Sequence, residues 1–169
     1  PPFVRYREKD GSGVRVLLIS QEGTQSTLDG LFDVMQSLDQ GAEGIGLFRT
    51  EVPFLLSERF PSEQEQYEIY REQLEAFSPK IVTMRTLDIG GDKALPYFPI
   101  EESNPFLGWR GIRVTLDHPE IFLSQVRAML KANAGLENLR IMLPMITNIA
   151  EVDEAIDLIK RSHREIQQE

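Results

Sequence analysis

The sequence predicts an α/β fold in which parallel strands alternate with helical crossovers. Two observations lead to this class. Short, continuously apolar and β-branched runs, such as the one at 81–84, are typical of strands that are buried on both faces. Segments with apolar residues at helical spacing lie between these runs. About four strand-helix units are expected, which corresponds to half of a (β/α)8 TIM barrel.

The first half of the chain contains two of the expected strands. Residues 1–13 are charged and contain glycine and proline, so we expect a linker or lead-in there and place the domain at 14–169. Strands are expected at 14–20 and 44–49, with a helix at 28–38 between them. The stretch 51–61 contains two prolines and is expected to be a loop. Ser62 and Glu65 have the spacing of a capping box, which predicts a helix from there to Phe77.

The second half contains the other two expected strands. A strand at 80–86 is followed by a long irregular stretch at about 89–117, and loops of this length inside a domain are usually functional or disordered. Its four aromatic residues argue against disorder. Pro119 is predicted to open a helix, with His118 as its capping residue. A strand at 139–146 and a helix at 149–159 complete the order. A flavodoxin-like open sheet is the alternative architecture, but no glycine-rich phosphate fingerprint follows the first strand, so we favour the half barrel.

Two of the expected strands end in the dipeptide Arg-Thr. Arg49 ends the strand at 44–49 and Arg85 lies near the end of the strand at 80–86, each with an acidic residue just after it. The carboxyl ends of parallel strands meet at one edge, which is where barrel active sites lie. A guanidinium group pairs two oxygens of a phosphate or carboxylate at once. The sequence therefore predicts an anion-binding edge.

Composition narrows the range of partners and locations. The net charge is −9 and the sequence pI is near 4.8, so no nucleic acid and no anionic membrane is expected as a partner. The absence of cysteine and of a long apolar run suits a cytoplasmic protein. The acidic residues Glu151, Asp153, Glu154 and Asp157 are expected to form a solvated helix face rather than a metal site. The chain has no initiator Met and is expected to be part of a longer protein.

The motifs at 44–51, 85–93 and 104–110 resemble the phosphoenolpyruvate-binding domain of Enzyme I of the bacterial phosphotransferase system. The resemblance runs from about Val14 to the C-terminus and implies the N-terminal half of that domain. The segments 50–55 and 110–119 are similar to the nitrogen-related paralogue. By resemblance, the full enzyme moves the phosphoryl group of phosphoenolpyruvate to a histidine of another domain and then to a phosphocarrier protein of the HPr type, with Mg²⁺ as cofactor.

The resemblance also assigns roles to residues. Arg49 and Arg85 would bind the phosphate group, and Arg110 would act as a mobile clamp from the long loop. Stacking of Arg110 on the neighbouring Trp109 is the equally weighted alternative. Asp88 and Lys93 would orient the arginines and the loop.

Several functional groups of the family do not match any residue of this chain. Its metal ligands, its general-acid cysteine and its phosphorylated histidine are expected outside residues 1–169, so the chain alone is expected to be inactive. The alternative function is a non-catalytic half barrel that self-associates, as a homodimer, or pairs with its missing half through open strand edges. Phosphoenolpyruvate binding that depends on Arg49 and Arg85 would separate the two hypotheses.

Overall fold

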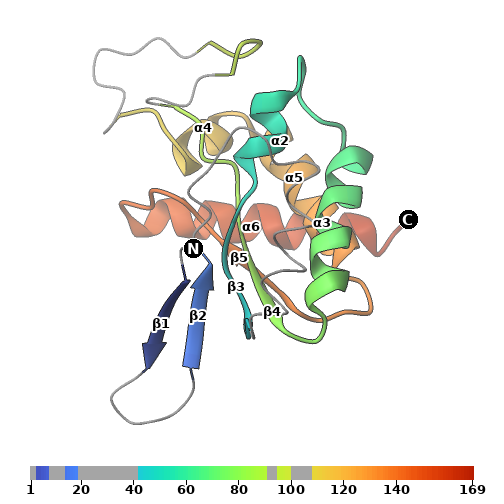
Figure 1. Cartoon of the computed structure of the whole chain (residues 1–169). Coiled ribbons are helices and arrows are strands. Elements are labelled where there is room, and N and C mark those ends of the chain that lie inside the picture. Colours follow the sequence, from blue (N-terminus) through green and yellow to red (C-terminus); the bar gives the residue numbers. More distant parts are fainter. Residues whose placement is uncertain (1–2, 8–13, 19–41, 91–94, 100–107) are drawn as a thin grey trace.

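A small parallel sheet lies at the centre of the computed structural model, which describes residues 3–7, 14–18, 42–90, 95–99 and 108–169. The sheet has three strands in the order β3-β4-β5, formed by Gly44–Arg49, Ile81–Arg85 and Leu139–Met142. Helices connect these strands and follow the last one (Figure 1): α2, Glu51–Leu56; α3, Glu63–Phe77; α4, Ile112–Asp117; α5, Pro119–Ala132; and α6, Ile149–Ile166. The predicted α/β class is confirmed.

The first expected strand forms, but it does not pair with the parallel sheet. β2, Val14–Leu18, pairs antiparallel with β1, Phe3–Arg7, in a separate two-stranded sheet. β1 lies inside the segment predicted to be a linker. The helix expected at 28–38 lies outside the described residues. The described residues therefore contain three parallel strands where four strand-helix units are expected, and the half barrel is not confirmed.

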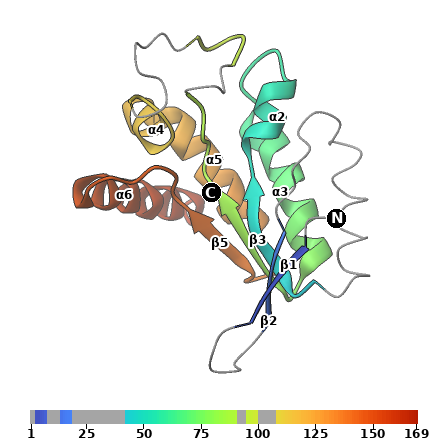
Figure 2. The same ribbon diagram turned by 60° about the vertical axis from the view of Figure 1, so that its left-hand side comes forward.

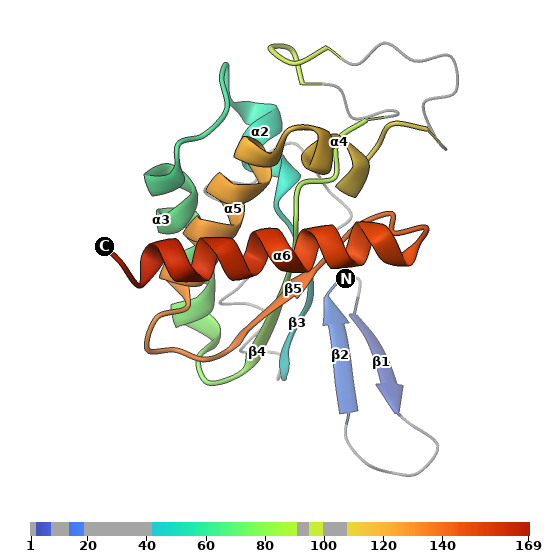
Figure 3. The same cartoon turned by 180° about the vertical axis from the view of Figure 1, so that it is seen from behind.

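Four helices, α3 to α6, pack together and against the sheet through two apolar clusters. The first cluster joins α3 and α5 to β3 and β4 through buried residues that include Tyr70, Leu74, Val82, Met84 and Met129. The second joins α4, α5 and α6. Seen from behind, α6 crosses in front of β5 (Figure 3). Among the described residues, no helix has the length and apolar character needed to cross a bilayer.

Two short helices lie at the carboxyl ends of the strands, where loops were predicted. α2 begins immediately after Thr50, and α4 begins at Ile112. Figure 2 shows both near this end of the sheet. The loop prediction for 51–61 was wrong at α2 because Pro53 lies in the first helical turn, where no intrahelical partner for its missing N–H is needed. α2 and α4 flank the edge at which Arg49 and Arg85 end their strands.

The predicted starts of α3 and α5 are confirmed. Ser62 accepts a hydrogen bond from the Glu65 backbone N–H, and the Glu65 carboxylate accepts one from the Ser62 N–H, so the capping box is complete. Pro119 is the first residue of α5. His118 occupies the N-cap position, but its side chain makes no cap hydrogen bond; its ring instead packs against Phe98.

A cluster of ion pairs joins α3, α5 and the end of α6. The guanidinium of Arg127 pairs with Glu63 at 2.9 Å, with Glu165 at 3.3 Å and with Glu169, while Lys131 pairs with Glu63 at 2.8 Å. For Glu63, burial opposes ionisation, but the hydrogen bonds from Lys131 and Arg127 outweigh it and lower the pKa. Hydrogen bonds from Lys131 and Arg127 likewise lower the pKa of Glu169.

Replacing Arg127 by methionine is expected to destabilise the chain at neutral pH. Loss of the Arg127–Glu63 pair alone is expected to lower the free energy of unfolding by about 1 kcal/mol. Carboxylates with a lowered pKa stabilise the fold above their unfolded pKa and lose this effect as the pH falls through the folded value. Urea unfolding at pH 7 and pH 3 should therefore show a smaller difference between wild type and variant at pH 3. Arg164→Met, an exposed arginine on α6, is the control and should leave both midpoints unchanged.

Candidate functional site

Arg49 and Arg85 are direct neighbours across two parallel strands. The register pairs Arg49 with Arg85, and Phe48 with Met84. Nearer the start of the strands, Ile45 pairs with Val82, so β3 uses one more residue than β4 over this distance. This bulge brings the two arginines into register, because without the extra residue Arg85 would face Phe48. The structure thus places both arginines at the same position of the carboxyl edge.

Two buried carboxylates hold the guanidinium of Arg85. Its Nη2 donates to Glu51 Oε1 at 2.6 Å, and its Nη1 lies 3.0 Å from Asp88 Oδ2. The side chains of Glu51 and Asp88 are 2% and 3% exposed, and that of Arg85 is 13% exposed. Because both carboxylates are out of water, their charges need this cation. The same two ion pairs hold the Arg85 guanidinium in place. Sequence reasoning predicted an orienting role for Asp88 but gave none to Glu51, the first residue of the unforeseen helix α2.

Arg110 shares a carboxylate with Arg85. Its Nε donates to Asp88 Oδ1 at 3.2 Å, and its Nη2 to Asp88 Oδ2 at 3.4 Å. Asp88 therefore joins the guanidinium groups of two predicted site residues that are 25 positions apart in the sequence. The ring of Trp109 packs beside Phe98 and His118, and its Nε1 donates to the carboxylate of Asp117.

Gly90 allows the segment that carries Arg110 to lie close to the end of β4. Gly90 has a φ of 109°, and a Cβ there would lie 2.8 Å from the Trp109 carbonyl oxygen and 3.0 Å from the Arg110 Cα. The N–H of Gly111 donates to the Ile89 carbonyl at 3.0 Å. Only glycine can adopt this φ and also allow the backbone of Trp109 and Arg110 to lie so close, because it has no Cβ. Gly91 and Lys93, the latter a predicted site residue, lie outside the described residues.

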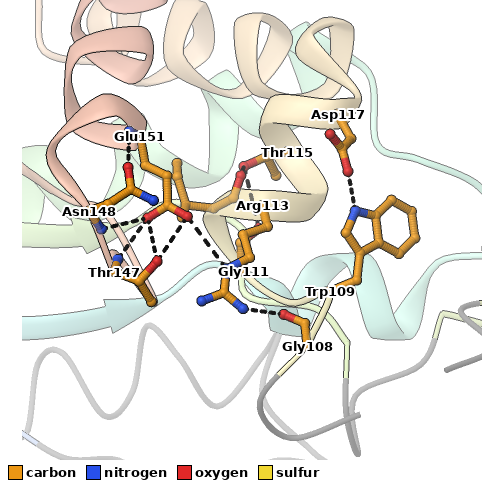
Figure 4. A network of polar contacts seen from close by, with 10 residues as sticks. Gly108, Trp109, Gly111, Arg113, Thr115, Asp117, Thr147, Asn148 and Glu151 are labelled. Carbon is orange, nitrogen blue, oxygen red and sulfur yellow. Dashed lines mark hydrogen bonds and ion pairs between the residues drawn. The ribbon is translucent and has the colours of Figure 1, made fainter. Parts of the chain in front are cut away.

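Arg113 connects the Arg110 segment to the start of α6 (Figure 4). Its Nη1 donates to the Gly108 carbonyl at 2.6 Å, and its Nε to Glu151 Oε1 at 3.4 Å. Glu151 and Asn148 form the capping box of α6. Backbone hydrogen bonds from Thr147 and Asn148 lower the pKa of Glu151 despite its partial burial. The solvated role predicted for Glu151 was therefore wrong, whereas Asp153, Glu154 and Asp157 are exposed.

The described residues contain no group of three or more His, Asp or Glu side chains that could hold a metal ion. What the carboxyl edge gathers instead is arginine from three separate segments. Arg85 and Arg110 contact the buried acids Glu51 and Asp88, and Arg49 lies beside Arg85 in the strand register. Such an arrangement suits an anionic ligand with several oxygen atoms, because each guanidinium offers planar donors in a fixed direction.

Comparison with known proteins identifies close relatives of this chain. The family described as PEP-utilising enzyme, PEP-binding domain, matches residues 25–169. A Salmonella typhimurium protein named phosphoenolpyruvate-dependent phosphotransferase system is 60% identical over 133 residues, covering 79% of this chain and 18% of that protein. A Staphylococcus carnosus phosphoenolpyruvate-protein phosphotransferase is 45% identical over 158 residues, covering 93% and 26%. The chain thus spans only about a fifth to a quarter of the length of these relatives.

Proposed function

This chain belongs to the PEP-utilising enzymes, within their PEP-binding domain, and we propose that its carboxyl edge binds the anionic groups of phosphoenolpyruvate. The observation that carries the proposal is the gathering of Arg49, Arg85 and Arg110 at one edge, with Asp88 contacting two of them.

The three arginines are proposed to have different roles. Arg49 and Arg85 bind the phosphate group from adjacent strand ends, and Arg110 closes over it from its loop. Phosphoryl transfer depends chiefly on positioning and on stabilising the charge of the moving group, which fixed guanidinium groups provide. Asp88 contacts the guanidinium groups of both Arg85 and Arg110, so it orients Arg85 and provides the position from which Arg110 closes.

We propose that the longer protein containing this segment is a phosphoenolpyruvate-protein phosphotransferase of the Enzyme I kind. The names of the two relatives support this reading. In that protein the phosphoryl group passes to a histidine and then to a phosphocarrier of the HPr type. The nitrogen-related subtype remains a prediction from the motifs at 50–55 and 110–119. Mg²⁺ is an expected cofactor of the longer protein, and the described residues of this chain offer no ligand set for it.

We also propose that the sheet continues into a (β/α)8 barrel. Among the described residues, β3 and β5 each pair on one side of the parallel sheet only. These edges favour a second candidate function, in which the chain associates through them with another copy, as a homodimer, or with further strands. The two functions can coexist, and ligand binding separates them.

Calorimetric titration with phosphoenolpyruvate, in the presence and absence of Mg²⁺, tests the proposal. The folded wild-type chain is expected to bind, and Arg49→Ala is expected to weaken binding by about 1.5 to 3 kcal/mol, the worth of charge-assisted hydrogen bonds. Arg140→Ala is the matched control, because Arg140 is an exposed arginine within β5 and not at a site-forming strand end. It should bind like wild type.

Each result decides between the two functions. Binding that is independent of Mg²⁺ and sensitive to Arg49 would support an arginine site that works alone. Equal binding by wild type and Arg49→Ala would reject the assignment of Arg49. A folded wild-type chain that binds no phosphoenolpyruvate would reject the proposed function. The second candidate function, association through the strand edges, would then be favoured.

A further inference from the structure

Gln125 lies directly beneath the two strand ends that carry Arg49 and Arg85. It belongs to α5 and is fully buried. Its Oε1 accepts a hydrogen bond from the backbone N–H of Leu87 at 2.7 Å, and its Nε2 donates to Thr50 Oγ1 at 2.9 Å. Thr50 directly follows Arg49, and Leu87 lies two residues after Arg85. One side chain thus connects both arginine-bearing strand ends to the helix behind them.

Only one assignment of donors and acceptors satisfies all the hydrogen bonds around Gln125. Thr50 Oγ1 donates onward to the carbonyl of Arg85 at 2.7 Å, so it closes a loop between the two strands. The second bond from Gln125 Nε2 goes to the hydroxyl of Tyr70 at 3.0 Å, and that hydroxyl donates to Gln66 Oε1 at 3.2 Å. Burial raises the pKa of Tyr70, so its hydroxyl stays protonated as a donor. Each hydroxyl donates once and accepts once, which leaves the Gln125 amide one orientation.

We propose that Gln125 is a positioning residue of the phosphoenolpyruvate site, which sets the relative placement of Arg49 and Arg85 by bridging Thr50 and Leu87. The inference rests on the proposed function. A backbone shift at Thr50 moves the guanidinium group of the neighbouring Arg49, and a shift at Arg85 moves its own. Multidentate recognition of an anion is sensitive to shifts well below 1 Å. Gln125 reaches no ligand itself and acts only through these two strand ends.

Asn138 provides a matched control at the opposite end of the same sheet. Its side chain is also buried, and its Nδ2 donates to the carbonyls of Leu74 and Lys80, both at 2.9 Å. Lys80 precedes the start of β4, whereas Arg85 is its last residue. A buried amide at each end of the sheet thus bridges two segments, but only Gln125 contacts the end that carries the arginines.

The test compares Gln125→Met with Asn138→Leu, two replacements that remove a buried amide while keeping similar size. Affinity for phosphoenolpyruvate is measured by calorimetry, and stability by urea unfolding, on the same preparations. Both variants are expected to lose stability. Gln125→Met is expected to bind about tenfold more weakly than wild type, and Asn138→Leu to bind as tightly as wild type.

The outcomes separate this inference from the proposed function. Loss of affinity in Gln125→Met alone supports the positioning role. Equal affinity of wild type and Gln125→Met, or an equal loss in both variants, overturns it while the proposed function stands. A wild type that does not bind overturns the proposed function, and the inference with it. If Gln125→Met does not fold, Thr50→Val breaks the same bridge from the other side and is expected to show the same tenfold loss.

Discussion

Replacing Arg85 by alanine is expected to weaken phosphoenolpyruvate binding by at least tenfold and to destabilise the chain by about 3 kcal/mol or more. Both effects have one cause. Arg85 supplies the positive charge at the carboxyl edge, and it is also the cation that pairs with the buried carboxylates of Glu51 and Asp88. Its removal leaves Glu51 without its 2.6 Å contact, and a buried charge that loses its partner is costly.

Arg85→Lys is the informative comparison for this prediction. Lysine keeps the charge but not the planar fork that contacts Glu51 and Asp88 through separate nitrogens. Stability measured by urea unfolding should recover in part, while affinity measured by calorimetry should stay low. Full recovery of affinity in Arg85→Lys would mean that charge alone is recognised. An Arg85→Ala variant as stable as wild type would contradict the structural role assigned to the ion pairs.

Local signals in the sequence were sufficient to predict much of the central fold. The strand at 44–49 matches β3, and the Ser62–Glu65 capping box and Pro119 mark helix starts as expected. Such features depend on residues within a few positions of one another. β1 was missed because the charged residues and glycines of 1–13 were given more weight than the strand-forming residues Phe3, Val4 and Tyr6. Its pairing with β2 was missed because pairing partners are decided by non-local contacts.

The candidate site shows the same division between local and non-local information. The Arg-Thr dipeptides predicted which strand ends carry the arginines. The bulge that aligns Arg49 with Arg85 was not predicted, although Gly46 lies in the shifted stretch and glycine inside a strand often marks a bulge. Gln125 was missed because it is 75 residues from Thr50 and reads as an ordinary helix residue. Arg113 and Glu151 are likewise 38 positions apart, and nothing in either local pattern indicates that they meet.

Gly90→Ala is expected to destabilise the chain by about 3 kcal/mol and to weaken phosphoenolpyruvate binding by about tenfold. Alanine at a φ of 109° carries a backbone strain of about 1 to 3 kcal/mol. The added Cβ would also lie 2.8 Å from the Trp109 carbonyl oxygen, which is backbone and cannot rotate away. The segment must shift, and the Gly111 hydrogen bond to Ile89 and the Arg110 contacts with Asp88 shift with it.

Gly135→Ala separates the strain from the collision. Gly135 also has a positive φ, of 77°, but a Cβ there meets no atom within 4 Å. This control should cost about 1 kcal/mol and leave affinity unchanged. The difference in stability between the two variants then measures the close approach of the Arg110 segment to the end of β4. If Gly90→Ala lowered stability and still bound phosphoenolpyruvate like wild type, the position of Arg110 beside Asp88 would not matter for binding, and the orienting role of Asp88 toward Arg110 would be rejected.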